Sequence, residues 1–168
     1  MSRLFLSAAA VAAALTLPAA PAAAALGPDA AACSAGANRP AMLVSVNGFK
    51  NRAGRLRVQV YGSNPSEFLA KGKKLRRIDL PVSGTGPMNV CVAVPRPGTY
   101  AVAVRHDADG NNKSGWNDGG GFSNNPRISL MDLKPSLKET AISVPNGVKP
   151  VRVVLNYRRG LAIGPVGR

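Results

Sequence analysis

The residues best suited to chemistry lie in one irregular stretch of the chain, which reads DADGNNKSGWNDGGGFSNN between His106 and Pro126. Asp107, Asp109 and Asp118 lie in it, although the whole chain has only 8 acidic residues and a formal net charge of +14. Crowded like charges cost free energy unless a positive charge lies among them, and Lys113 is the only cation between these acids. The stretch therefore predicts either a cation site or a set of capped turns.

The spacing of the oxygen-bearing residues favours calcium. With Asp107 at the first position of a calcium loop, Asp109 is third, Asn111 fifth, Lys113 seventh through its carbonyl oxygen, and Asp118 twelfth. This is the order of oxygen donors in the EF-hand loop. A set of oxygen ligands without cysteine or a second histidine selects a hard cation, calcium before magnesium, and argues against zinc.

Two residues depart from the EF-hand pattern. Asn112 stands where that loop has glycine, although asparagine is the next best residue for positive φ, and Asp118 replaces the usual bidentate glutamate. No helices are expected on either side, so the expectation is the loop geometry alone. The alternative is that the Asp and Asn side chains only cap turns. The sequence leaves both interpretations open.

Three other residues near the loop have a chemical and a structural interpretation. His106, the only histidine, lies on the opposite strand face from Asp107, so a hydrolase would need Asp109 or Asp118 to fold back onto it. Its structural interpretation is a hydrogen bond to the loop backbone. Trp116 and Phe122 either stack on a sugar or base, or fold back over the core. No G-x-S-x-G or H-E-x-x-H motif is present, and we predict no catalytic residue.

A cluster of cations forms a second candidate site, for polyanions. It consists of Lys71, Lys73, Lys74, Arg76 and Arg77. Such a run binds the phosphates of lipopolysaccharide or another anionic glycan. Its alternative is an ordinary solvated edge strand that its charges protect from pairing.

The first 25 residues differ from the rest of the chain. Arg3, the apolar run 4–17 and the small residues that follow predict a signal peptide over residues 1–25. The apolar run is shorter than the ~20 residues that cross a bilayer, so a membrane anchor is the weaker interpretation, and the mature chain is expected to have no transmembrane segment. We therefore expect a periplasmic or secreted protein.

The two cysteines, Cys33 and Cys91, both follow this segment. In an oxidising compartment one disulfide between them is the default. The alternative is a lipidated Cys33, but lipoprotein cysteines follow the apolar segment closely, and here Pro18, Pro21 and Pro28 intervene. The disulfide is the prediction.

The elements that position these residues are predicted to be strands. Met42, Val44 and Val46 alternate with other residues, which is the period of a half-buried strand, and a turn at 50–54 predicts a hairpin with a strand at 56–60. Further strands are expected at 74–80, 89–94, 99–106, 127–131, 140–144 and 151–157. About seven or eight short strands at this spacing predict an all-β protein, a single antiparallel β-sandwich of the immunoglobulin or transthyretin type.

One short helix is expected at 65–71, because Asn64 and Pro65 offer an N-cap and a first-turn proline. The predicted organisation is a flexible lead at 26–40, the sandwich domain at 41–158 and a C-terminal tail at 159–168 that is a loose end or an edge cover.

Gly98 to Pro126 resembles a family of exported bacterial proteins, domain of unknown function 2141. The shared features are a G-x-Y strand, the His106-Asp107 pair, the loop from Asp109 to Asp118, and the G-F-S-N-N segment from Gly121 to Asn125. The loop differs from the family's usual Asn and Gly at positions 109 and 112. The resemblance implies a small periplasmic or secreted β-sandwich and transfers no catalytic residue.

These observations predict an exported, non-catalytic envelope or secreted binding module whose loop binds calcium and whose partner is an envelope protein. Binding of polyanions through the basic run is the alternative, and an unrecognised hydrolase is third. Chromosomal nucleic acid is excluded as a partner by export and by the lack of aromatic residues among the cations.

Overall fold

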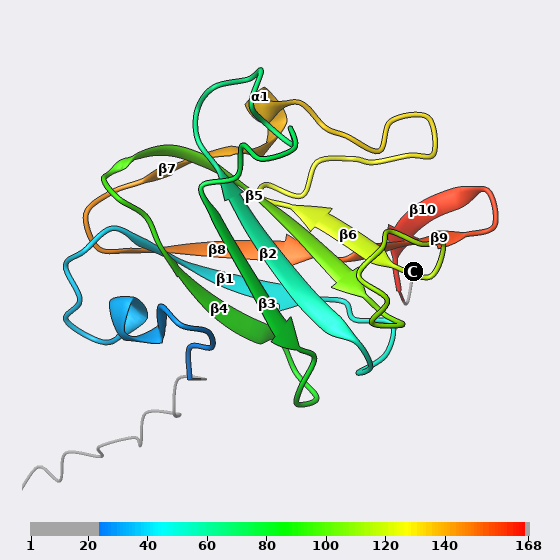
Figure 1. Ribbon diagram of the computed structural model, residues 1–168, viewed down its shortest axis with the longest axis horizontal. Helices are drawn as coiled ribbons and strands as arrows, with labels where there is room; N and C mark the ends of the chain where they lie inside the picture. The colour runs from blue at the N-terminus through cyan, green and yellow to red at the C-terminus, as the bar shows by residue number, and fades with distance from the viewer. Residues whose placement is uncertain (1–23, 167–168) are drawn as a thin grey trace, which may run out of the picture.

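The computed structural model describes residues 24–166 and contains two β-sheets and one short α-helix (Figure 1). Residues 1–23, which hold most of the expected signal peptide, lie outside the described residues. The strands are β1 Ala41–Asn47, β2 Arg55–Tyr61, β3 Arg76–Pro81, β4 Met88–Ala93, β5 Gly98–Asp107, β6 Gly119–Phe122, β7 Ala141–Val144, β8 Val148–Val154, β9 Asn156–Arg159 and β10 Ala162–Pro165. The prediction of an all-β protein is confirmed.

Strand pairing divides the molecule into a smaller and a larger sheet. The smaller sheet has the order β4-β1-β8, and the larger has the order β10-β9-β6-β5-β2-β3, with β7 also paired to β5. β1 and β8 are parallel, whereas the other paired strands are antiparallel. The expectation of a purely antiparallel fold is therefore wrong at one pair. β7 and β8 belong to different sheets, so β8 enters the smaller sheet by a crossover and not through a hairpin with β7.

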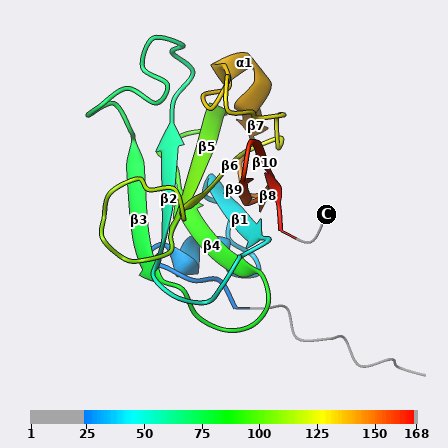
Figure 2. The same cartoon turned by 90° about the vertical axis from the view of Figure 1, so that its right-hand side faces the viewer.

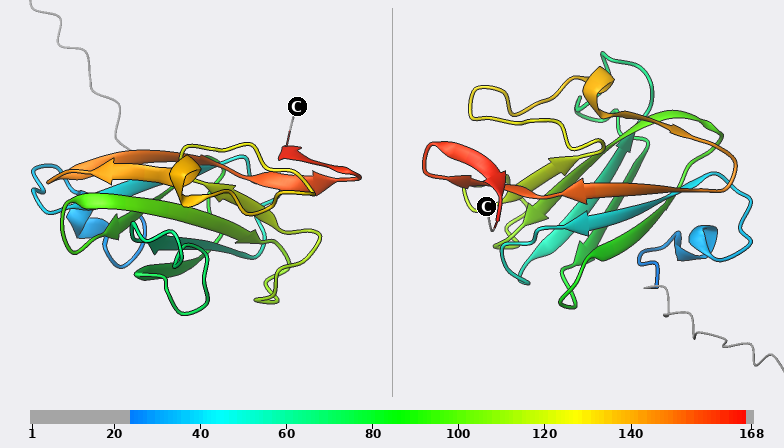
Figure 3. Two further views of the ribbon diagram at one scale, coloured as in Figure 1. Left: turned by 90° about the horizontal axis from the view of Figure 1, so that it is seen from above. Right: turned by 180° about the vertical axis from the view of Figure 1, so that it is seen from behind.

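The core lies between the two sheets. Seen from behind, β8 and β1 lie in front of β2, β3 and β5 (Figure 3), and side chains of both groups pack into one hydrophobic cluster. Met42 on β1 and Leu56 on β2 are both 0% exposed. The expected hairpin between these strands is nevertheless wrong, because β1 pairs with β4 and β8 while β2 pairs with β3 and β5. The alternation of apolar and other residues along a strand indicates which face is buried, but it does not identify the neighbouring strand.

The helix expected at 65–71 is also wrong. That segment consists of turns, and Leu69 has φ +59°, which ends any helical path. The α-helix, α1, is Leu137–Thr140, where Ser136 and Glu139 form a reciprocal capping box.

Two further strand predictions need correction, and two strands were not predicted. The segment 127–131 is irregular, and 151–157 is two strands, because the chain passes from the smaller to the larger sheet at Leu155. β6 was not predicted, because its sequence is GGGF and glycine is rare in strands. Two of its glycines are required by packing: a Cβ at Gly119 would lie 2.5 Å from the Tyr157 ring, and one at Gly121 would lie 2.7 Å from Val154 O. β10 lies in the expected tail and forms the sheet edge.

The segment expected as a lead makes specific contacts with the domain. Cys33, at the end of a short 3-10 helix (Ala30–Cys33), forms a disulfide with Cys91 of β4 across a Cα–Cα distance of 5.9 Å. The disulfide prediction is confirmed. Leu26 accepts a hydrogen bond from the Cys91 amide, and Asp29 Oδ2 accepts one from the Ala93 amide. Residues 24–166 contain no helix that is long and apolar enough to cross a membrane.

Removing this disulfide should destabilise the domain. The bond closes a sequence separation of 58 residues, for which the chain-entropy model gives about 4 kcal/mol. We expect the double variant Cys33→Ala, Cys91→Ala to lose about 2–5 kcal/mol in urea unfolding. Mass spectrometry after alkylation without reduction should find no modified cysteine in the wild type. Equal stability of variant and wild type would contradict this role.

Candidate functional site

The loop between β5 and β6 holds the predicted site, and the sheet register brings its two ends together. β5 and β6 are antiparallel neighbours with His106 opposite Gly119. One step further along this register, Asp107 at the end of β5 and Asp118 just before β6 come side by side. The loop and the β9–β10 hairpin lie toward the same end of the molecule, which faces the viewer in Figure 2.

The three acidic residues of the loop form a cluster. One carboxylate oxygen from each of Asp107, Asp109 and Asp118 lies within 4.8 Å of those of the other two. Asp107 is 1% exposed, Asp118 is half-buried and Asp109 is exposed. The cluster thus runs from the protein interior to the surface, with its most buried carboxylate on a regular strand.

The buried carboxylate of Asp107 is only partly satisfied. Its Oδ2 accepts a hydrogen bond from the Asn112 amide at 2.9 Å and a long one from Arg105 Nη2 at 3.4 Å. Its Oδ1 is buried and has no hydrogen-bond partner among the described residues, and the same holds for Arg105 Nε. Buried charges are costly unless they are paired, so this oxygen is the feature of the loop that most needs a partner.

The Asp and Asn side chains of the loop, which were expected either to bind calcium or to cap turns, do cap turns. The Asn111 amide donates to Asp109 Oδ1 at 3.1 Å, the Lys113 amide donates to Asn111 Oδ1 at 2.7 Å, and Asn112 has φ +64°. Asp118 accepts from the amides of Ala108 and Gly115 through its two oxygens. An ionised carboxylate has about four lone-pair sites, so these bonds leave acceptor capacity on each acid.

His106 fills a structural position beneath the loop. It is 0% exposed, its Nε2 lies 2.8 Å from Ala53 O, and its Nδ1 lies 2.6 Å from the Tyr157 hydroxyl. A carbonyl only accepts, so Nε2 carries the proton and Nδ1 accepts from Tyr157, whose oxygen in turn accepts from the Lys50 amide at 3.2 Å. Burial raises the pKa of the Tyr157 hydroxyl to about 12, with the Lys50 amide acting in the opposite direction.

Loss of the Tyr157 hydroxyl should therefore cost stability. Tyr157→Phe leaves His106 Nδ1 and the Lys50 amide without their partner, which costs about 1–3 kcal/mol. The matched control is Tyr61→Phe, because the buried Tyr61 makes no side-chain hydrogen bond among the described residues. Urea unfolding measures both variants. An equal loss in the two variants would show that the hydroxyl of Tyr157 does not hold this network.

Trp116 in the loop and Phe122 at the end of β6 differ in position. Trp116 is 74% exposed, so the expectation that it folds back over the core is wrong. The Arg158 guanidinium lies over its ring, 3.4 Å from the centroid. Phe122 is half-buried and packs edge-on against Phe68, with ring centroids 6.5 Å apart. Sequence patterns missed this arrangement, because Arg158 lies on β9, which is far from the loop in the sequence and comes next to it only through the pairing of β9 with β6.

The residues of the basic run lie before and on β3, an edge strand of the larger sheet. Asp79, also on β3, is the ion-pair partner of Arg77. Burial would raise the pKa of Asp79, but hydrogen bonds from Arg57 and Arg77 lower it below its ordinary value. Lys71 and Lys74 have no ion-pair partner among residues 24–166. The other three cations of the run pair with carboxylates: Lys73 with Glu67, Arg76 with Asp29, and Arg77 with Asp79. These ion pairs reduce the positive charge that the run presents.

The G-F-S-N-N segment joins β6 to its surroundings. Buried Ser123 accepts from the Val102 amide and donates to Thr140 O. Asn125 binds β8 through both ends of its amide, accepting from the Val154 amide at 2.7 Å and donating to Arg152 O at 3.0 Å. The segment therefore fixes the strand that follows the acidic loop.

The sequence profile of one family, described as "Uncharacterized protein conserved in bacteria (DUF2141)", matches residues 44–152. The chain belongs to this family, and the match runs from the middle of β1 through most of β8, including the acidic loop and the G-F-S-N-N segment. No curated protein and no solved structure is detectably similar to the chain.

Proposed function

We propose that the protein is an exported, non-catalytic binding module whose acidic loop binds one calcium ion and presents a surface to an envelope or extracellular partner. The observation that carries the proposal is the buried Oδ1 of Asp107. Among residues 24–166 it has no hydrogen-bond partner, and its carboxylate belongs to a cluster of three carboxylates within 4.8 Å of one another. A divalent cation among these oxygens offsets both the burial of one charge and the repulsion among three.

The donor set fits calcium better than other metals. Carboxylate oxygens with free lone pairs suit a hard cation, and calcium tolerates irregular geometry with six to eight oxygen ligands. The loop would add Asn111 Oδ1 and the Lys113 carbonyl to the three acids, with Asp118 closing the site. Aspartate is shorter than the usual bidentate glutamate, so affinity should be weak, about 10⁻⁴–10⁻³ M as in extracellular modules.

Export and the fold type belong to the same proposal. The N-terminal segment 1–25 has the composition of a signal peptide, and the Cys33–Cys91 disulfide suits an oxidising compartment. We take the two sheets to be a sandwich of immunoglobulin or transthyretin type with one parallel pair, bounded near residues 41 and 158. The non-catalytic part is supported by His106, whose two ring nitrogens both serve structural hydrogen bonds.

Calcium should stabilise the mature protein. For the expected affinity range, calcium at about 10 mM should raise the free energy of unfolding by about 1.4–2.7 kcal/mol through mass action. This corresponds to a rise in Tm of roughly 3–10 °C. We expect EDTA to reverse the shift and Asp107→Asn combined with Asp109→Asn to abolish it. Asp132→Asn is the matched control, because Asp132 is exposed and lies outside the cluster. Scanning calorimetry of all three proteins measures the effect.

The two asparagine substitutions keep the shape of the side chains, so circular dichroism should show the native fold. A Tm of the wild type that is indifferent to 10 mM calcium would contradict the proposal. An equal calcium shift in the double variant would place the ion elsewhere and contradict it as well. Asp109→Asn alone provides a milder test, since Asp109 is exposed and its carboxylate accepts hydrogen bonds from Asn111 alone among the described residues.

A second candidate function is binding of an anionic glycan or lipopolysaccharide through the basic run. The observation that favours it is the excess of 22 Lys and Arg over 8 Asp and Glu. Counterion release makes such binding strongly salt-dependent. The ion pairs of Lys73, Arg76 and Arg77 act against it.

This second function predicts a change in heparin chromatography. Replacement of four cations of the run by glutamine should lower the salt concentration at which the protein elutes. The four are Lys73, Lys74, Arg76 and Arg77. The control replaces four exposed cations elsewhere, Arg96, Arg127, Lys134 and Lys138. Similar elution of the two quadruple variants would show that only net charge matters and that the run is a solvated edge.

A further inference from the structure

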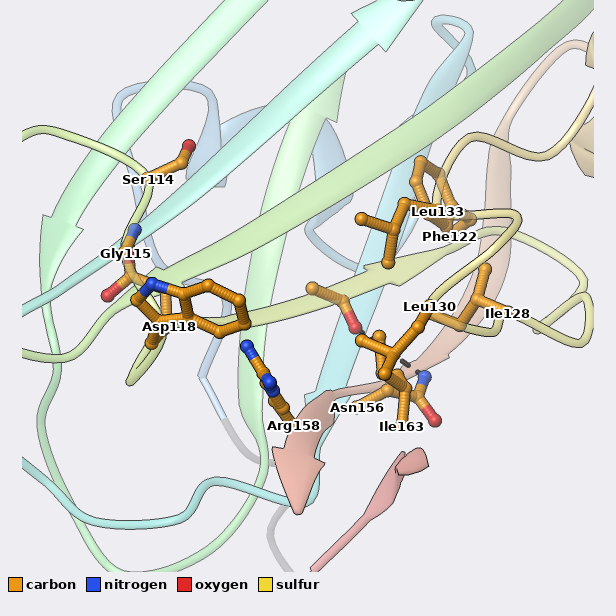
Figure 4. A pocket seen from close by; sticks show the side chains of 12 residues that line it. Ser114, Gly115, Asp118, Phe122, Ile128, Leu130, Leu133, Asn156, Arg158 and Ile163 are labelled. Atoms are coloured by element: carbon orange, nitrogen blue, oxygen red, sulfur yellow. Dashed lines mark hydrogen bonds between the residues drawn. The ribbon is translucent and has the colours of Figure 1, made fainter. Parts of the chain in front are cut away.

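A cavity of about 360 Å³ lies beside the acidic loop, between residues 114–118, the segment 128–133 and the strands β9 and β10 (Figure 4). Its volume falls at the lower end of the range of small-molecule sites, about 300–1,000 Å³. Most of its wall is apolar and comes from Phe122, Ile128, Leu130, Leu133 and Ile163. Leu133 is 52% exposed, so part of this apolar wall is open to solvent.

One side of the cavity carries an ordered cation. Arg158 Nε donates to Gly160 O at 2.9 Å, and its guanidinium stacks on the Trp116 ring at 3.4 Å from the centroid. Its two terminal nitrogens make no further hydrogen bond among residues 24–166. The stack and the backbone bond fix the side chain, so a bound anion would meet a pre-organised pair of donors.

We propose that this cavity binds an amphipathic carboxylate with an acyl or aromatic body. The carboxylate lies on the terminal nitrogens of Arg158, and the apolar body lies among Phe122, Leu130 and Leu133. A sugar fits the cavity less well, because its hydroxyls need several polar partners and the wall offers mainly Ser114, Asp118 and Asn156 beside Arg158. The proposal goes beyond the calcium function and does not require it.

The cavity also shares a residue with the acidic cluster. Asp118 lines the cavity and belongs to the cluster, with its two oxygens on the amides of Ala108 and Gly115. Its negative charge opposes an anionic ligand, and a cation in the cluster would reduce that opposition. If the cluster binds calcium, calcium and carboxylate should each strengthen the binding of the other by the same factor.

The test compares octanoate with 1-octanol, which has the same apolar chain and no charge. Isothermal titration calorimetry of the mature protein measures both, and the fluorescence of Trp116, the single tryptophan, reports binding at the cavity. We expect saturable binding of octanoate at least tenfold tighter than that of octanol. Equal affinities would overturn the carboxylate assignment, and no saturable binding of either would overturn the site.

Two variants and a control locate the ligand. Arg158→Gln should weaken the binding of octanoate about tenfold and leave the affinity for octanol unchanged. Leu133→Ser should weaken the binding of both. Leu133 is half exposed, so its loss leaves the core intact. Arg96→Gln, an exposed arginine outside the cavity, should match the wild type. Equal effects of the two arginine variants would overturn the proposal.

Titration in EDTA and in 10 mM calcium separates the two proposals. Octanoate binding in EDTA supports the cavity site whether or not calcium shifts the Tm. A calcium-dependent Tm without octanoate binding in either buffer overturns the cavity site alone.

Discussion

The burial of one carboxylate at the end of the central strand constrains the whole candidate site. Asp107 is 1% exposed, and one of its oxygens has no hydrogen-bond partner in the described part of the chain. Asp107 is ion-paired with Arg105 through its other oxygen, but a buried carboxylate oxygen without a partner still costs about 1–3 kcal/mol or more, so the loop around Asp107 must supply compensation. The Asn112 amide and the Arg105 guanidinium, at 2.9 Å and 3.4 Å from Asp107 Oδ2, provide a part of it. A cation held jointly with Asp109 and Asp118 would provide the rest.

The sheet sets the geometry of this constraint. β5 pairs with β2 on one edge and with β6 and β7 on the other, so its last residues are held on both sides. Alternation then sends His106 inward to Tyr157 and Asp107 toward the loop. A Cβ at Gly54 would lie 1.9 Å from Asp107 O, so only glycine allows the 50–54 turn to pass under the strand end. The family's G-F-S-N-N segment completes the frame by fixing β6 to β5 and β8.

The sequence predicted the features that depend on local pattern or on compartment. Alternation identified the buried faces of β1 and β2, and the expectation of an oxidising compartment led to the prediction of the Cys33–Cys91 disulfide. It could not predict features that depend on distant partners. Gly119 and Gly121 of β6 are needed because Tyr157 and Val153 occupy the space that their side chains would fill, and Arg76 pairs with Asp29 from 47 residues away. The cavity is built from the loop, 128–133 and β9–β10, so no single motif marks it.

The most direct test is a crystal structure of the mature protein grown with calcium, with an anomalous difference map calculated at a wavelength where calcium scatters. The account predicts one peak within about 2.3–2.6 Å of a carboxylate oxygen of Asp107, Asp109 and Asp118. The contradicting result is a map without a peak there, in which Arg105 has turned so that its Nε donates to Asp107 Oδ1. That rotation would satisfy both unpartnered atoms without any metal.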